Sequence, residues 1–210
     1  DGVLPIDTYK KDLDDVCKIT LQYDWEALRL SIVKDGLRHS TLSAQMPSES
    51  SSIVSNATNG IEPPRGFLSV KKSKKGPLKQ IVPQYQSLKN YYTLLWDMPS
   101  NEGYINIVAV MQKFFDQAIS GNWSYNPTHF ENNEVPMSVM LQDMLTTYKL
   151  GWKTSYYQNT YDFKSDPSDD EVEETVKLES PINGFEPQIG RAEFNGTDDE
   201  YEEYCDSCAI

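Results

Sequence analysis

Apolar residues recur at helical spacing in two long segments, and both patterns predict amphipathic helices. The first segment is Tyr104–Ser120, with Asn101 as a candidate N-cap and Gly121 as the residue that closes it. The second is Met137–Leu150. The apolar positions are Ile105, Val108, Phe115 and Ile119 in the first segment and Met137, Leu141, Met144, Leu145 and Tyr148 in the second. The methionines of the second segment fit either an adaptable docking groove or ordinary core packing.

Two further helices are predicted from their apolar positions and their boundary residues. One begins at Trp25, where Asp24 is a suitable N-cap, and ends before Gly36. The other is Leu88–Met98, which Pro99 terminates because proline cannot continue a helix.

Shorter alternating or β-branched segments predict strands. Thr41–Met46 alternates like a half-buried strand, and Trp152–Gln158 is predicted as another. Phe67–Val70 and Leu78–Val82 flank the lysine-rich turn Lys71–Gly76, which predicts a hairpin. We interpret its basic tip as a solvated loop rather than a binding patch.

The formal charge of −13 is confined to the end of the chain. Residues 1–161 contain 16 basic and 16 acidic residues, whereas residues 162–210 contain 3 basic and 16 acidic ones. We therefore predict a folded part over 1–161 and a flexible acidic tail over 162–210. The acidity argues against nucleic-acid binding, and no apolar run approaches the roughly 20 residues of a membrane span.

The segment Pro47–Ser52 follows a predicted strand and precedes a helix-like stretch, Ile53–Asn59, that stops at Gly60. Backbone N–H groups at a helix N-terminus favour anions, so this run of small hydroxyl residues is a candidate phosphate-binding loop. It lacks the glycines and the lysine of a Walker loop. The alternative is a plain cluster of serine N-caps.

Two cysteines, Cys205 and Cys208, form a CxxC pair near the C-terminus. Zinc needs further ligands, and Cys17, His39 and His129 do not stand in ligand spacing, so no metal site is predicted. The pair is either an accessible dithiol on a flexible arm or incidental. Neighbouring carboxylates would raise the thiol pKa and make the pair a slow attacking nucleophile, suited to exchange with a disulfide held nearby.

Tyr156 and Tyr157 are adjacent in the predicted strand at 152–158. Adjacent phenols are able to pass a radical between them, because each is oxidised and deprotonated together. A second adjacent pair, Tyr91-Tyr92, makes the pattern less specific, and aromatic packing along a strand is the alternative.

In this order, the segments resemble the large (α) subunit of class I ribonucleotide reductases, nearest class Ia. The resembling blocks are Trp25–Pro47, Met46–Ser52, Asn56–Gly66, Met111–Phe114, Pro136-Met137 and Gly151–Thr160, together with the terminal cysteine pair. The resemblance implies an α/β fold, namely the C-terminal portion of the family's ten-stranded α/β barrel, with helices, a hairpin and the acidic tail. The CxxC spacing and the long acidic tail depart from the family pattern.

The resemblance also implies roles for individual residues. The loop that holds the substrate diphosphate matches Pro47, Ser48, Glu49, Ser50 and Ser51. Tyr156 and Tyr157 match a stacked pair that carries the radical from the small (β) subunit toward the active-site cysteine. Cys205 and Cys208 match the tail dithiol that re-reduces the active-site disulfide and is itself reduced by thioredoxin or glutaredoxin. The helix at 137–150 lies where the small-subunit tail docks.

The implied activity is reduction of ribonucleoside diphosphates to deoxyribonucleoside diphosphates for DNA synthesis. The radical cysteine, its partner cysteines and the effector sites have no counterpart in this sequence. We therefore expect the chain to work with the N-terminal portion of the large subunit, as one chain of a split subunit or as a shortened one. No cofactor is expected on this chain, since the diiron-tyrosyl radical belongs to the small subunit and ATP or dNTP effectors bind elsewhere in the large one. A cytoplasmic location, in a bacterium or in a phage host, is expected.

A second hypothesis is a catalytically inactive interaction module that binds the small subunit or a thioredoxin. The two hypotheses differ in whether adding the missing portion restores activity.

Overall fold

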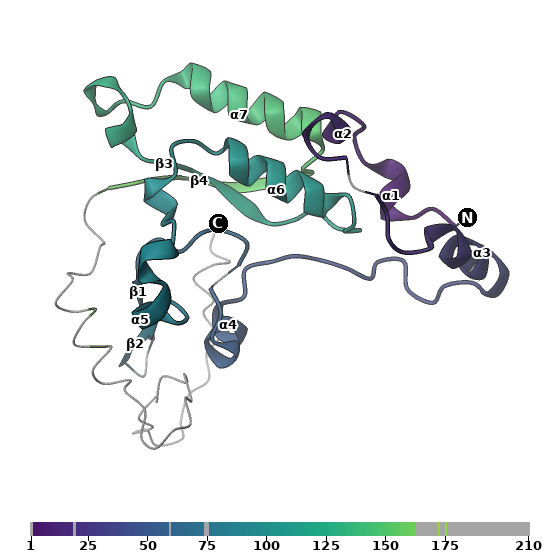
Figure 1. Ribbon diagram of the computed structural model, residues 1–210, viewed down its shortest axis with the longest axis horizontal. Helices are drawn as coiled ribbons and strands as arrows, with labels where there is room; N and C mark the ends of the chain where they lie inside the picture. The colour runs from purple at the N-terminus through teal and green to yellow at the C-terminus, as the bar shows by residue number, and fades with distance from the viewer. Residues whose placement is uncertain are drawn as a thin grey trace.

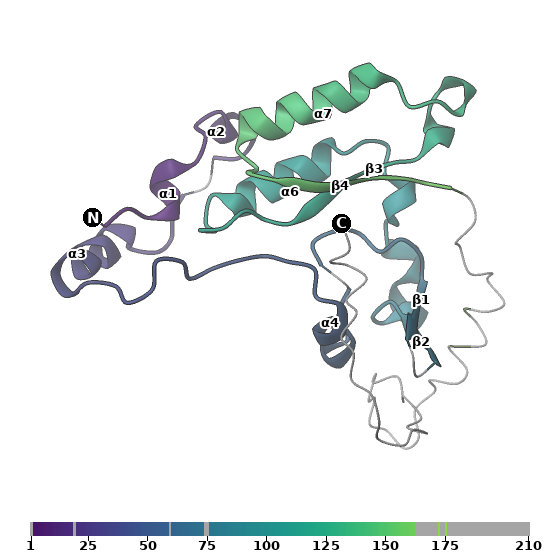
Figure 2. The ribbon, with the colours of Figure 1, turned by 180° about the vertical axis from the view of Figure 1, so that it is seen from behind.

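The computed structural model describes residues 2–18, 20–58, 60–73 and 76–162, together with Val172 and Thr175. Two helices lie one above the other over a pair of strands, as both views of the ribbon show (Figures 1 and 2). Three N-terminal helices extend from one end of this block. A long extended segment leads from them to a short helix and a hairpin on the other side.

The central block is a β–α–β unit. Strand β3 (Gly121–Tyr125) leads through helix α7 (Met137–Leu150) to strand β4 (Ser155–Thr160), which pairs with β3 in parallel. Parallel neighbours need such a crossover, because a tight turn reverses the chain direction. The buried cluster around this unit contains Leu13, Tyr104, Ile105, Val108, Ala109, Ile119, Trp123, Tyr125, Leu150 and Trp152. The arrangement agrees with the predicted α/β class, although β3 was not predicted and β4 begins at Ser155 rather than Trp152.

Helix α6 (Glu102–Gln112) buries Ile105 and Val108 as predicted, but it ends eight residues before the predicted Ser120. The side chain of Gln112 ends it. Its Oε1 accepts a hydrogen bond from Ile119 N at 2.9 Å, and its Nε2 donates to Gln117 O at 2.7 Å. These bonds stabilise a turn, so Phe115 and Ile119 lie outside the helix and Gly121 opens β3.

Asn101 stands at the N-cap position of α6 without capping it, which contradicts the predicted role. Its Nδ2 donates to Asp143 Oδ2 at 2.8 Å, and its Oδ1 accepts from Ser124 N at 3.0 Å. The side chain is therefore engaged by α7 and β3 in the buried interior.

Helix α7 has the predicted bounds, and its inner side carries two buried polar residues beside the apolar Leu150, Val139 and Met140. Asp143 and Thr147 point inward, where Asp143 also accepts from Tyr125 Oη at 3.0 Å and Thr147 accepts from Trp123 Nε1 at 3.3 Å. The apolar stripe predicted from the sequence is exposed, and its members are Met137, Leu141, Met144, Leu145 and Tyr148. Of the three methionines of this helix, Met140 packs against the core, whereas Met137 and Met144 are exposed.

The N-terminal helices are α1 (Pro5–Thr8), α2 (Leu13–Val16) and α3 (Trp25–Asp35). The predicted cap of α3 is confirmed, since Asp24 accepts a hydrogen bond from Ala27 N at 2.9 Å. Gly36 ends the helix with a φ of 79°, a left-handed value that favours glycine.

The predicted strand Thr41–Met46 is an extended segment with one parallel bridge, between Gln45 and Ile119, and is not a regular strand. Ser43 O and Gln45 O accept hydrogen bonds from Gln117 N at 3.2 Å and Ser120 N at 3.0 Å. The two N–H donors belong to the irregular turn that follows α6. This turn does not present a continuous row of backbone groups, so its pairing with Thr41–Met46 is limited.

The predicted hairpin is confirmed, with β1 (Leu68–Ser73) antiparallel to β2 (Gly76–Ile81), and both strands extend into the predicted turn. The predicted helix Leu88–Met98 is wrong. Its place is taken by α5 (Tyr85–Leu88) and the 3-10 turns η1 (Lys89–Tyr91) and η2 (Leu95–Asp97).

Tertiary hydrogen bonds interrupt this helix. Tyr92 adopts an extended conformation, with φ −73° and ψ 134°, and its hydroxyl donates to Pro83 O at 2.8 Å. Leu95 N donates to Pro64 O at 2.8 Å instead of to a helical partner.

The predicted tail, 162–210, lies outside the described residues except at Asp162, Val172 and Thr175. Val172 is buried in a cluster with Leu68, Ile81 and Val82 of the hairpin region, and Thr175 is also buried. The predicted boundary near Tyr161 stays a prediction.

Candidate functional site

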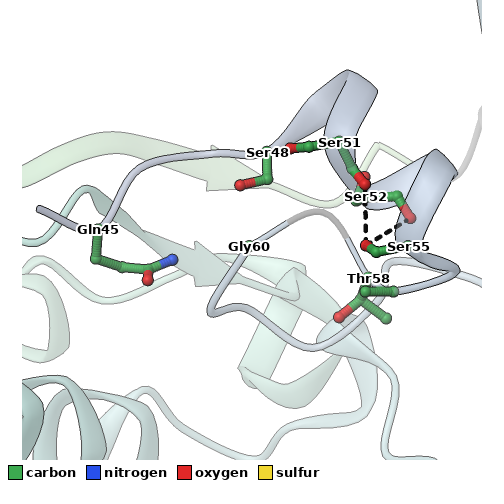
Figure 3. Close-up of a pocket in the computed structure, with 8 residues that line it drawn as sticks. Gln45, Ser48, Ser51, Ser52, Ser55, Thr58 and Gly60 are labelled. Atoms are coloured by element: carbon green, nitrogen blue, oxygen red, sulfur yellow. Dashed lines mark hydrogen bonds between the residues drawn. The ribbon is translucent and has the colours of Figure 1, made fainter.

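A polar cavity of about 220 Å³ borders helix α4 (Glu49–Ser55). Figure 3 shows the hydroxyl groups of this helix gathered on one side, opposite Gln45 and Gly60. The lining residues are Gln45, Ser48, Ser51, Ser52, Ser55, Ala57, Thr58 and Gly60. The described lining residues include hydroxyl and amide side chains and no charged one.

The helix begins earlier than predicted. The sequence analysis placed its start at Ile53, whereas α4 starts at Glu49 and spans 7 residues. Ser52 N donates to Ser48 O at 3.0 Å, which closes the first helical turn. Asn56 ends the helix with a φ of 50°. The serines are therefore inside the helix or next to its start.

Of the five predicted phosphate-loop residues, Ser48 and Ser51 line the cavity and Pro47 does not. The side chains of Glu49 and Ser50 lie outside the part of the chain that the structure describes. Pro47 instead supports the wall, because its Cα lies 3.9 Å from the point where a Cβ on Gly60 would stand. Ser52, part of the candidate loop Pro47–Ser52, also lines the cavity, whereas the sequence analysis missed the contributions of Gln45, Ser55, Ala57, Thr58 and Gly60. Serines at 48, 51, 52 and 55 have the i, i+3, i+4, i+7 spacing of one helix face, and that spacing could have identified Ser55.

Tyr156 and Tyr157 contact each other on β4. Their ring centroids are 4.4 Å apart and their planes meet at 73°, which is an edge-to-face contact rather than a parallel stack. Both side chains are about half exposed, at 56% and 52%. The structure thus brings the two phenols together at the surface of the described chain.

Asn122 on β3 lies against this pair. Its Oδ1 accepts a hydrogen bond from Tyr157 N at 2.8 Å. Glu62 Oε1 accepts from Asn122 N at 2.8 Å and from Asn122 Nδ2 at 2.6 Å. Burial raises the pKa of the Glu62 carboxyl above its usual value, against the lowering effect of these hydrogen bonds. Neither Glu62 nor Asn122 was predicted as a site residue, and no spacing in the sequence links the two.

The loop that contains Gly60 and Glu62 contacts both the serine cavity and the residues beside the tyrosine pair. Gly60 lines the serine cavity, and Glu62, two residues later, holds Asn122 beside the tyrosines. Burial and the nearby Glu62 charge also raise the pKa of the Tyr104 phenol. Tyr104 contacts Trp152 edge to face, with ring centroids 5.7 Å apart.

Cys205 and Cys208 lie outside the described residues, and Cys17 is a partly buried free thiol. Within the described ranges, no group of three or more His, Cys, Asp or Glu side chains is placed to hold a metal ion. Across those same ranges, no helix has both the length and the apolar character required to cross a bilayer.

Comparison with known proteins identifies a family model and several relatives that are similar to this chain. The family model described as "Ribonucleotide reductase, barrel domain" matches residues 1–158. The ribonucleoside-diphosphate reductase subunit alpha of Haemophilus influenzae is 61% identical over 169 residues, which cover 80% of this chain and 22% of that protein. Ribonucleoside-diphosphate reductase 1 subunit alpha of Escherichia coli K12 is 60% identical over 171 residues, covering 81% and 22%.

The subunit alpha of Enterobacteria phage T4 is 44% identical over 180 residues, which cover 85% of this chain and 24% of that protein. The chain thus spans less than a quarter of the length of these relatives. The match over residues 1–158 and the level of identity place the chain in the ribonucleotide reductase barrel-domain family.

Proposed function

We propose that this chain is the C-terminal part of the catalytic barrel of a ribonucleoside-diphosphate reductase large subunit, nearest class Ia. The observation that carries the proposal is the 61% identity over 169 residues to a protein named for that activity. The reaction is reduction of ribonucleoside diphosphates to deoxyribonucleoside diphosphates. Because the chain spans only part of its relatives, we propose that it acts with the rest of the large subunit.

The serine cavity is proposed to hold the diphosphate of the substrate. Ser48 and Ser51 line it, and hydroxyl groups donate hydrogen bonds to phosphate oxygens. The cavity of about 220 Å³ is smaller than a usual small-molecule site and suits one end of a nucleotide. The remaining walls would then come from the rest of the subunit.

Tyr156 and Tyr157 are proposed to relay the radical, each giving up an electron and a proton and then recovering both. The ring contact at 4.4 Å supports direct transfer between them. Cys205 and Cys208 are proposed to reduce the active-site disulfide and to be reduced in turn by thioredoxin or glutaredoxin.

The small subunit, which would carry the diiron-tyrosyl radical, is the other proposed partner. The exposed apolar stripe of α7 supports docking of its tail, since contiguous exposed apolar surface marks interaction sites. Nucleotide effectors would bind elsewhere in the large subunit, and the complex would be cytoplasmic.

The test is reconstitution. The chain is mixed with the rest of the large subunit and with the small subunit, and reduction of a ribonucleoside diphosphate is measured with a thioredoxin system. We expect turnover that requires all three components. Complex formation by size-exclusion chromatography is the control, and a well-formed complex without turnover would contradict the proposal.

The α7 stripe also favours a second candidate, an interaction module that binds the small subunit without catalysis. In that case the Leu141→Glu variant would abolish binding to the small subunit, and no added chain would restore turnover. Turnover in the reconstituted complex would exclude this candidate.

A further inference from the structure

The tyrosine pair occupies a β-bulge. Gly121 pairs with Ser155 and Trp123 pairs with Gln158, so one residue of β3 stands opposite two residues of β4. The extra residue lies within the Tyr156-Tyr157 dipeptide. Side chains of successive residues in a regular strand point to opposite faces, and a bulge breaks this alternation. Both rings are exposed and touch each other, as the bulge allows.

Asn122 is the single residue of β3 opposite this bulge. Where the backbone ladder is interrupted, its side chain forms a hydrogen bond to β4. Its Oδ1 accepts from Tyr157 N at 2.8 Å, so its Nδ2 must point the other way. There Nδ2 donates to Glu62 Oε1 at 2.6 Å. The same Oε1 accepts from Asn122 N at 2.8 Å, so Glu62 holds both the backbone and the side chain of Asn122.

The backbone next to Asn122, at Gly121, is closely packed against Tyr104 and Trp152. A Cβ on Gly121 would meet the hydroxyl of Tyr104 and would lie 2.9 Å from Cζ2 of Trp152. Trp152 Nε1 donates to Ile119 O at 2.8 Å, which fixes the indole against this point. The β3 side of the bulge is therefore closely packed, and on the β4 side Asn122 Oδ1 accepts the hydrogen bond from Tyr157 N.

We propose that Asn122 is a positioning residue for the tyrosine pair and that Glu62 is its anchor. The amide of Asn122 stabilises the bulge that places both phenols on one side in contact. This inference rests on the proposed relay role of Tyr156 and Tyr157.

The test uses the reconstituted complex and compares Asn122→Ala with the matched control Asn90→Ala, which makes the same change at an exposed position. We expect Asn122→Ala to lower kcat by about a hundredfold, because small misplacements of reacting groups have effects of that size. KM for the nucleoside diphosphate and binding of the small subunit should not change. Hydrogen exchange of the peptide covering 153–160 should accelerate in Asn122→Ala and stay unchanged in Asn90→Ala.

A second substitution at Asn122, which changes its charge but hardly its size, separates loss of positioning from loss of folding. Asn122→Asp places a carboxylate against Glu62 across a 2.6 Å contact, so kcat should fall as pH rises and the shared proton is lost. Adding Glu62→Gln removes one of the two facing charges, so the double variant should lose the pH dependence.

An unchanged kcat in Asn122→Ala, or a pH dependence that persists in the double variant, would overturn the inference. Lower thermal stability without a change in kcat would do the same. The Tyr157→Phe variant separates this from failure of the proposed function. If Tyr157→Phe is inactive while Asn122→Ala is fully active, the relay stands and the positioning role fails. If Tyr157→Phe is active, the relay itself is wrong.

Discussion

The guanidinium of Arg29, on α3, binds both carboxylate oxygens of Asp7, on α1, with two N···O distances of 2.7 Å. Arg29 also donates to Gly2 O, so one side chain joins α3 to the start of the chain. The hydrogen bonds from Arg29 and from Leu4 N lower the pKa of Asp7 to about 2.

This ion pair predicts a pH dependence of the N-terminal helices. The pKa of Asp7 is lower in the folded state than the usual ~3.9 of an unfolded chain, so the pair stabilises fully above pH ~4. That stabilisation is lost as pH falls through about 2. Thermal unfolding of wild type and Asp7→Asn should therefore differ above pH 4 and converge toward pH 2. If the unfolding temperatures of wild type and Asp7→Asn differ by the same amount at every pH in this range, the prediction is contradicted.

The phenol groups at the relay predict a loss of turnover without a loss of structure. Tyr156→Phe and Tyr157→Phe keep the ring contact but remove the ionisable hydroxyl, so each should abolish nucleoside diphosphate reduction in the reconstituted complex. Because both side chains are about half exposed, removing either hydroxyl group should leave the unfolding temperature unchanged. Tyr91→Phe, at an exposed position outside the site, is the matched control and should retain full activity.

The close packing at Gly121 predicts a specific destabilisation. Gly121→Ala should cost about 1–3 kcal/mol, the usual cost of overpacking, because the new methyl group meets Tyr104 and Trp152. Gly103→Ala is the control, since nothing lies within 4 Å of its added Cβ, and this change should stabilise helix α6 by up to about 1 kcal/mol.

A second change tests the assigned cause of that loss. Tyr104→Phe removes the nearest atom to the added methyl group and should recover part of the stability lost in Gly121→Ala. The measurement is chemical denaturation of all four proteins. Independent, additive effects of the two changes would contradict the packing explanation.

The serine cavity predicts an effect on substrate binding rather than on chemistry. Ser48→Ala and Ser51→Ala each remove a hydroxyl group that lines the cavity. A hydrogen bond to a charged group contributes about 1.5–3 kcal/mol, so KM should rise roughly tenfold to a hundredfold while kcat changes little. Ser87→Ala removes an exposed hydroxyl elsewhere and should leave KM unaltered. If the two cavity variants match Ser87→Ala, the cavity is not the phosphate site.

The terminal cysteine pair predicts a dependence on the reductant. Changing Cys205 and Cys208 together to serine should slow turnover with thioredoxin, because the shuttle is lost. Turnover with a small dithiol that reaches the active site directly should be spared. Equal rates with both reductants would count against the shuttle role.

Local signals predicted several elements well. The cap Asp24, the stop Gly36 and the bounds of α7 follow from rules that act within one turn of helix. The hairpin likewise depends on neighbouring residues. In contrast, the end of α6 depends on the Gln112 side chain bonding to a later turn, and the break at Tyr92 depends on a hydroxyl bond to Pro83 O. Tertiary bonds of this kind leave no periodic trace in the sequence.

The orientation of α7 shows the same limit for the candidate site. Its sequence pattern left open whether the methionines form a docking groove or pack in the core. In the structure, Asp143 and Thr147 take inner positions because β3 and Asn101 offer them hydrogen-bond partners. The adjacent tyrosines could be found in the sequence, whereas the bulge that brings their rings together could not. The support from Glu62 comes from a residue 60 positions away from Asn122.

The sheet of β3 and β4 has two strands, with one further bridge at Gln45, over the described residues. Parallel sheets are stable when several strands are joined and both faces are covered. Any additional barrel strands that bind here stabilise the folded chain by mass action. At a free concentration 100 times the dissociation constant, this linkage amounts to about 2.7 kcal/mol. The unfolding temperature of the chain therefore becomes a titratable measure of barrel assembly.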